Sequence, residues 1–223
     1  MDLENCSFED VHIVAEHIEG WLNYDEAKLL YNTAKNLTGA GAIVEIGSWC
    51  SKSLTYTSAA ALSVGNLCKK FSIDPFLTSK EEPNGKYETF ISNLKQNGLF
   101  DKIIHLKQKS QDAGQNFDEK IELLFIDGFH KYAAVKQDFE LFFPKIIEGG
   151  FVAIHDITYY EGPTRLVQEL AQNSENFKFI TFLGATLLGQ KVEKLTPEDK
   201  LNNQNILQLI ELKLKSDNIV LIV

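Results

Sequence analysis

Short apolar runs recur along the chain at the length expected of buried β-strands. Five of them come before residue 156, at 42–46, 69–73, 102–106, 121–126 and 151–155. Segments with helical spacing of apolar residues separate them, at about 51–64, 86–97, 110–118 and 131–147. This alternation predicts parallel strands joined by right-handed crossover helices. We therefore expect an α/β fold built on a doubly wound, mostly parallel sheet.

The pattern changes toward the carboxyl end, after a further helix near 163–172. The apolar segments 177–183 and 185–190 are close enough to pair as an antiparallel hairpin, which brings the sheet to seven strands. Residues 196–215 open with a cap, a proline and two acids and predict a last helix. The apolar tail 219–223 is either a buried edge or a subunit contact, and it leads us to expect a homo-oligomer.

We expect one domain over residues 1–223. Its parts are a helical segment at 1–40, a core sheet at 41–190, and a carboxyl-terminal helix and tail at 191–223. The helical segment contains a capping sequence at Asn23–Glu26. A chain of 223 residues with 44% hydrophobic content is long and apolar enough to bury one sizeable core.

Composition and charge exclude several classes of partner. The net charge of −9, without a basic cluster, argues against nucleic-acid binding. No apolar run approaches the ~18 residues of a membrane span, and the chain opens with acids where a signal peptide carries basic residues. We therefore expect a cytoplasmic protein without a membrane partner. Cys6, Cys50 and Cys68 form no C-x-x-C pair, which fits reduced thiols.

Two turns that follow predicted strands carry the residues expected to bind a cofactor. In open parallel sheets, ligands bind beyond the carboxyl ends of the strands, where the strand order reverses. The first strand runs into a turn of small residues at 47–53, and the second ends at Asp74, whose carboxylate can accept hydrogen bonds from a ribose diol. Gly47 is the only glycine of the first turn, whereas a dinucleotide site usually has three there. A ligand with ribose but no phosphate fits better, which favours S-adenosylmethionine.

Acidic and histidine residues follow the fourth and fifth strands. Asp127 and His130 come after the fourth strand, and His155 and Asp156 after the fifth. These strands are neighbours in a doubly wound sheet, so the side chains are expected to converge beside the cofactor. Asp127, His155 and Asp156 are candidate ligands of one divalent cation, and His130 is the candidate general base. A bound cation lowers the pKa of an alcohol, and a nearby imidazole can collect its proton.

At these positions the sequence resembles a known family. The match runs from about Gly20 to Leu170, through seven segments at 20–22, 44–49, 73–75, 125–130, 149–150, 155–156 and 162–165. Segment 44–49 reads Val-Glu-Ile-Gly-Ser-Trp, and segment 125–130 reads Phe-Ile-Asp-Gly-Phe-His. They are similar to bacterial class I methyltransferases related to the macrocin and mycinamicin sugar O-methyltransferases, a pattern shared with cephalosporin-hydroxylase-like proteins. The resemblance implies a Rossmann-like methyltransferase fold.

The resemblance also implies roles for individual residues. Glu45, Gly47 and Ser48 would hold the methionine part of S-adenosylmethionine, and Asp74 would hold the ribose. Gln108 to Ser110 would lie near adenine. The full set of expected cofactor-binding residues is Glu45, Gly47, Ser48, Trp49, Ser53, Asp74, Pro75, Phe76, Gln108, Ser110 and Asp127.

The chain departs from the family pattern at two positions. Ser51 stands where the family usually has glycine, and His155 where the sugar enzymes have glutamate. In those enzymes the residues matching Asp127, His155 and Asp156 bind magnesium, and the residue matching His130 is the proposed base. An imidazole suits manganese, iron, cobalt or zinc better than magnesium, so the metal is either magnesium or a transition metal. His155 also points away from the metal if neighbouring strand residues face opposite sides.

Taken together, these features predict an S-adenosylmethionine-dependent methyltransferase that uses a divalent metal to methylate a hydroxyl on a small molecule such as a sugar. Two alternatives stay open. One is a methyltransferase-like fold that binds a ligand or partner without catalysis, and the other is a nucleotide-dependent oxidoreductase. Acceptor specificity is expected in the amino-terminal segment and in the region after Asp156, where 158–161 offers aromatic and polar contacts.

Overall fold

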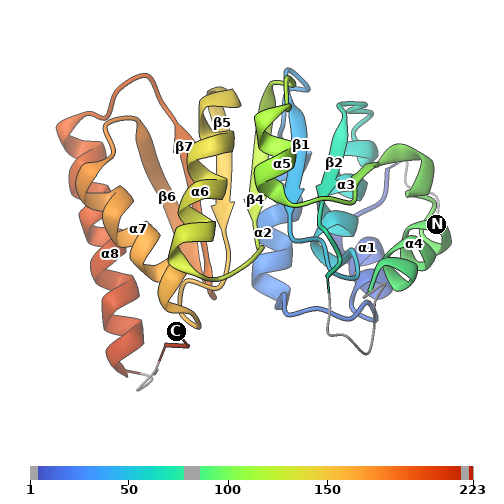
Figure 1. Ribbon diagram of the computed structural model, residues 1–223, viewed down its shortest axis with the longest axis horizontal. Helices are drawn as coiled ribbons and strands as arrows, with labels where there is room; N and C mark the ends of the chain where they lie inside the picture. The colour runs from blue at the N-terminus through green and yellow to red at the C-terminus, as the bar shows by residue number, and fades with distance from the viewer. Residues whose placement is uncertain (1–4, 78–85, 217–220, 223) are drawn as a thin grey trace.

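The computed structural model describes residues 5–77, 86–216 and 221–222. Within them, seven strands form one sheet in the order β3-β2-β1-β4-β5-β7-β6 (Figure 1). The strands are β1 (Ala42–Ile46), β2 (Lys70–Ile73), β3 (Ile104–Leu106), β4 (Ile121–Ile126), β5 (Ile146–Ile154), β6 (Phe177–Leu183) and β7 (Thr186–Lys191). The predicted α/β fold with a doubly wound, seven-stranded sheet is confirmed.

Helices cover both faces of the sheet. They are α1 (Phe8–Ala15), α2 (Tyr24–Lys35), α3 (Lys52–Ser63), α4 (Tyr87–Gln96), α5 (Ser110–Gln115), α6 (Tyr132–Phe142), α7 (Glu161–Asn173) and α8 (Pro197–Ser216). In Figure 1, α5, α6 and α7 lie in front of the sheet, and α2 lies behind it. None of the helices in the described ranges is both long and apolar enough to cross a membrane.

The strand order reverses at β1, which pairs in parallel with β2 on one side and β4 on the other. At the carboxyl end of this strand, Ile46 lies opposite Ile73 and Ile126. A crevice at such a switch point is the usual place for a ligand. β7 runs antiparallel to both β5 and β6. The predicted hairpin through Gly184, a residue with φ of 62°, is therefore confirmed.

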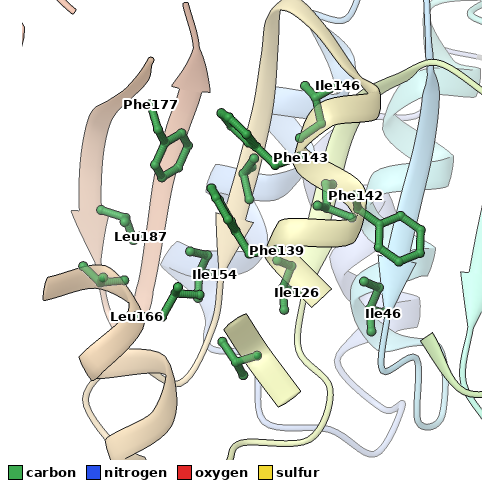
Figure 2. Packing of buried hydrophobic residues seen from close by; sticks show 14 of the residues in the cluster. Ile46, Ile126, Phe139, Phe142, Phe143, Ile146, Ile154, Leu166, Phe177 and Leu187 are labelled. Carbon is green, nitrogen blue, oxygen red and sulfur yellow. The ribbon is translucent and has the colours of Figure 1, made fainter. Parts of the chain in front are cut away.

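Side chains on the two faces of the sheet fill separate cores. On one face, Val44 and Ile46 of β1 pack with Phe139 and Phe142 of α6 and with apolar residues of α7 and α8. Figure 2 shows the aromatic centre of this core between α6 and the strands. On the other face, Ile43 packs with residues of α1, α2 and α3. Both faces are covered, which explains why the parallel strands are apolar without alternation.

Some predicted boundaries were wrong. β5 begins at Ile146, whereas we predicted helix as far as residue 147 and a strand only from 151. Pro144 accounts for the difference, because α6 ends at Phe142 and one turn of 3₁₀ helix over Phe143–Lys145 leads directly into the strand. Of the apolar tail 219–223, only Leu221 and Ile222 lie among the described residues. Ile222 forms a parallel bridge with Tyr160.

Candidate active site

One cleft lies at the carboxyl ends of β1, β2, β4 and β5. Its volume is about 780 Å³. The residues that line it are Trp21, Ile46, Gly47, Trp49, Ile73, Asp74, Pro75, Leu77, Lys109, Ser110, Gln111, Asp127, Gly128, Phe129, His130, Ala134, Asp138, His155 and Asp156. The cleft thus contains the predicted metal residues and part of the predicted cofactor set.

The turn after β1 is held in an unusual backbone conformation. Gly47 has φ of 86°, and a Cβ there would lie 2.0 Å from the carbonyl oxygen of Asp127, so the turns after β1 and β4 touch. Trp49 and Ser51 follow with φ of 44° and 78°, a region that non-glycine residues rarely adopt. Ser51 therefore holds a left-handed backbone without being glycine. Strained backbone of this kind concentrates at functional sites.

Asp74 organises this turn. One of its carboxylate oxygens accepts hydrogen bonds from the backbone N–H groups of Ser48 (2.9 Å) and Trp49 (3.0 Å), and the other accepts one from Phe76 (2.6 Å). Burial raises the pKa of Asp74, and these three hydrogen bonds oppose that effect. A carboxylate has about four acceptor positions, so roughly one is left for a ligand hydroxyl. Asp74 therefore keeps acceptor capacity for a ribose hydroxyl, and its contact with the ribose diol stays a prediction.

Glu45 lies beneath the turn and is only 1% exposed. Neither carboxylate oxygen has a hydrogen-bond partner, although the hydroxyls of Ser53 and Ser48 are nearby. Burial raises the pKa of Glu45 to about 8, an effect that these hydroxyls only partly offset. Burying a carboxyl without a hydrogen-bond partner is costly, so Glu45 destabilises the folded chain.

The turns after β4 and β5 bring a second polar group together. Asp127, His130 and Asp156 each offer one ligand atom, and these atoms all lie within 4.8 Å of one another. The Nε2 atom of His130 is 3.0 Å from Asp156 Oδ2 and 3.9 Å from Asp127 Oδ1. Asp156 turns toward the cleft because its backbone is left-handed, with φ of 60°. The three side chains come from two adjacent strands, as we predicted for the group as a whole.

His130 is held by charge and by stacking. Burial lowers its pKa, but the carboxylates of Asp127 and Asp156 outweigh burial and raise the pKa to about 9. The imidazole also stacks on the ring of Tyr160, with centroids 4.0 Å apart and planes inclined by 20°. In this state His130 is a cation at neutral pH, whereas a free general base has to be neutral.

His155 faces a different environment, although it adjoins Asp156 in the sequence. It is 3% exposed, and its Nδ1 atom is 3.0 Å from Asp127 Oδ1. Its Nε2 atom is 3.7 Å from Glu26 Oε2, an ion-pair distance longer than a hydrogen bond. Its Nδ1 atom also lies 3.4 Å from Asp156 Oδ1, but the group of mutually close ligand atoms contains His130 and not His155, and His155 as a metal ligand stays a prediction.

The predicted cofactor residues fall into three sets. Gly47, Trp49, Asp74, Pro75, Ser110 and Asp127 line the cleft. Glu45, Ser48, Ser53 and Phe76 are buried behind its wall. Gln108 is exposed and lies outside the cleft lining.

The sequence did not identify several residues that line the cleft, among them Gln111 and Asp138. Gln111 lines the cleft where we had expected Gln108. Asp138 of α6 also lines it, is 2% exposed, and accepts a 2.5 Å hydrogen bond from the Ser110 hydroxyl. Burial raises the pKa of Asp138 to about 6. An aspartate within a predicted helix is expected on its exposed face, so the sequence did not indicate that Asp138 is buried.

Comparisons with known proteins agree with this geometry. A family profile described as a methyltransferase domain matches residues 44–157. "Uncharacterized protein R132" of Acanthamoeba polyphaga mimivirus is 24% identical over 181 residues, which cover 71% of this chain and 80% of that protein.

Two solved structures are similar in fold. The O-methyltransferase TomG from Streptomyces achromogenes, in complex with S-adenosylmethionine, has a TM-score of 0.59 and 16% identity, over 83% of this chain and 87% of that one. CalS11, a TDP-rhamnose 3'-O-methyltransferase of calicheamicin biosynthesis, has a TM-score of 0.54 and 13% identity, over 82% and 92%. The profile covers half of the chain, and on that basis this protein belongs to the family of methyltransferase domains.

Proposed function

We propose that the protein transfers a methyl group from S-adenosylmethionine to a hydroxyl of a small molecule, with the help of a divalent cation. One observation carries the proposal: a single cleft joins the strained turn at Gly47 to the group formed by Asp127, His130 and Asp156. Family membership argues against an oxidoreductase. The cofactor in the TomG complex and the sugar substrate of CalS11 support the choice of cofactor and make a sugar one candidate acceptor.

The donor set suits a metal ion. Two carboxylates and one imidazole match manganese, iron, cobalt or zinc better than magnesium, which prefers oxygen ligands alone. We propose that Asp127, His130 and Asp156 hold the ion, with His130 as its nitrogen ligand once metal binding displaces the second proton of its ring. A bound cation would lower the pKa of the acceptor hydroxyl. The prediction that His130 is the general base stays a prediction. It requires that Asp127 and Asp156 bind the metal without the His130 imidazole.

The chain itself has to align the two reactants. The attacking oxygen forms a bond to the methyl carbon while the carbon–sulfur bond breaks, and S-adenosylhomocysteine leaves as the hydroxyl proton is lost to a base or to water. The sulfonium is already reactive, so holding oxygen and carbon roughly 3 Å apart is the main task. Asp74 would accept a ribose hydroxyl, and Glu45, buried behind the cleft wall, would support the methionine part from beneath the Gly47 turn.

Three exposed apolar side chains surround the cleft opening. Trp21 is 77% exposed, Leu77 is 71% exposed and Phe129 is 66% exposed, and all three line the cavity. Trp21 lies against Trp49, with ring centroids 6.0 Å apart. We propose that these side chains contact the acceptor. Aromatic faces suit both sugar rings and planar acceptors, so they do not select between these two classes.

Thermal denaturation with added ligands tests the proposed cofactor. S-adenosylhomocysteine should raise the melting temperature, because a ligand at 100 times its Kd stabilises the native state by about 2.7 kcal/mol. NAD should leave it unchanged. A shift with NAD and none with S-adenosylhomocysteine would reverse the assignment in favour of an oxidoreductase.

We also propose that the protein self-associates through α8. Leu201, Leu209 and Leu212 are each more than half exposed on this helix. The edge of β6 is less available for pairing, because Asn203 of α8 caps its backbone at Phe177 and Phe179. Light scattering at tens of micromolar should give a dimer, and a monomer would refute the proposal.

A further inference from the structure

The side chains of His155 and Asp156, at the end of β5, point in different directions. The backbone N–H of His155 still donates to Ile126 of β4 at 3.0 Å, as a strand residue does. Asp156 then adopts φ of 60°, which turns its side chain into the cleft toward His130. The His155 ring is buried at the cleft lining and faces Asp127 and Glu26 instead. Adjacent residues therefore serve different parts of the site.

Both ring nitrogens of His155 face carboxylates. Nδ1 is 3.0 Å from Asp127 and 3.4 Å from Asp156 Oδ1, and Nε2 is 3.7 Å from Glu26. The nearby carboxylates outweigh burial and raise the pKa of His155 to about 11. Both nitrogens thus face carboxylates already, and the group of mutually close ligand atoms is formed by Asp127, His130 and Asp156, without His155.

Hydrogen bonds from the start of α2 and from the β6–β7 turn hold the Glu26 carboxylate in place. It completes the capping box of α2 by accepting from the backbone N–H of Asn23 at 3.0 Å. Its other oxygen accepts from the backbone N–H of Ala185, in the β6–β7 turn, at 2.6 Å. The turn approaches so closely that a Cβ at Gly184 would lie 2.5 Å from Glu26 Oε1. A carboxylate held in this way is a rigid support for the imidazole.

We propose that His155 is a positioning residue, supported by Glu26, that fixes the Asp127 carboxylate toward the cleft and does not itself bind the metal. This inference rests on the proposed metal site. Residues that ligate metals are commonly oriented by a hydrogen-bond partner behind them, and losing such a partner lowers metal affinity about 10- to 100-fold. Through Glu26, the same contact ties the start of α2 and the β6–β7 turn to the reacting end of the sheet.

Manganese binding to the full-length protein tests this role without any acceptor. Affinity would be measured from the EPR signal of free Mn²⁺, and ¹⁴N coupling to bound Mn²⁺ by electron spin-echo spectroscopy. Wild type should show coupling to an imidazole nitrogen. His155→Gln should keep this coupling but bind Mn²⁺ about tenfold more weakly. His130→Gln should lose the coupling.

A pair of substitutions separates positioning from folding. His155→Asn keeps an N–H donor close to the position of Nδ1, so it should retain more Mn²⁺ affinity than His155→Gln. Glu26→Gln should weaken binding in the same direction as His155→Gln. Two matched controls should leave Mn²⁺ binding unchanged. His105→Gln replaces a histidine whose Nε2 atom is also buried without a hydrogen-bond partner. Glu122→Gln replaces a buried carboxylate far from the cleft that accepts hydrogen bonds from Thr38 and Gly39.

The outcomes are distinct. Coupling lost in His155→Gln and kept in His130→Gln would make His155 the ligand and overturn the inference. Unchanged affinity in both His155→Gln and Glu26→Gln would also overturn it. If wild type binds no Mn²⁺ at all, the metal part of the proposed function fails, and the inference fails with it.

Discussion

Glu45→Gln should make the protein more stable while it weakens cofactor binding. The Glu45 carboxyl is 1% exposed without a hydrogen-bond partner, and burial raises its pKa to about 8 from the usual 4.5. Between these two values the folded protein holds a proton that the unfolded chain has released. Stability therefore falls as pH rises from 4.5 to 8.

The size of the effect follows from the pKa. Each unit of pKa difference corresponds to about 1.36 kcal/mol, so retaining this proton costs the folded state about 3 kcal/mol at pH 7. Glutamine has nearly the same volume and carries no proton to lose. Glu45→Gln should thus match wild type near pH 4.5 and exceed it in unfolding free energy by up to about 3 kcal/mol at pH 7.

Urea unfolding of the ligand-free proteins across pH 4.5–8 measures this difference. The raised pKa values of His130 and His155 also remove stability as pH rises, but they act in both proteins and cancel in the comparison. Glu122→Gln is the control. It removes a charged carboxylate that accepts hydrogen bonds from Thr38 and Gly39, so it should only lower the unfolding free energy. Calorimetry should show weaker S-adenosylhomocysteine binding to Glu45→Gln. A stability difference independent of pH would refute the reasoning.

Three further substitutions test other parts of the account. Ser51→Gly should raise the unfolding free energy by about 1 kcal/mol, because it relieves a left-handed residue and removes a buried hydroxyl without a partner; a loss of stability in urea unfolding would contradict this. Asp74→Ala should weaken S-adenosylhomocysteine binding by about 1.5–3 kcal/mol, and unchanged affinity by calorimetry would remove Asp74 from the site. Asn203→Leu should cost about 2 kcal/mol by uncapping β6, and unfolding that matches wild type would show that the edge needs no cap.

The fold could be predicted because its signals are local. The central strands are short, mostly apolar runs, and capping boxes such as the one at Asn23 and Glu26 mark helix starts within a few residues. The start of β5 was missed because Glu148, Gly149 and Gly150 interrupt the apolar run, while the pairing of Ile146 with Ile121 extends the strand across them. Pairing between strands is a tertiary effect, and the residues of one segment alone do not reveal it.

The sequence predicted the location of the site but not the contacts that its side chains make. Strand ends identified Asp127, His130, His155 and Asp156 together, because parallel topology brings these ends to one edge. Their individual roles depend on backbone angles, such as the left-handed Asp156, and on a partner far away in sequence, Glu26. Alternation along a strand would turn His155 away from the metal, and this alternative stays a prediction. Asp138 and Gln111 had no motif to mark them.

Methyl transfer itself is the most direct test of the central claim. The protein, S-adenosylmethionine and a panel of sugar and phenolic hydroxyl acceptors would be incubated with Mn²⁺ and then with a chelator, and the products followed by mass spectrometry. The account predicts a methylated acceptor and S-adenosylhomocysteine in equal amounts with metal, and loss of turnover on chelation while S-adenosylhomocysteine still binds. Full turnover in the chelator would contradict the metal's role, and failure to bind S-adenosylhomocysteine at all would contradict the account as a whole.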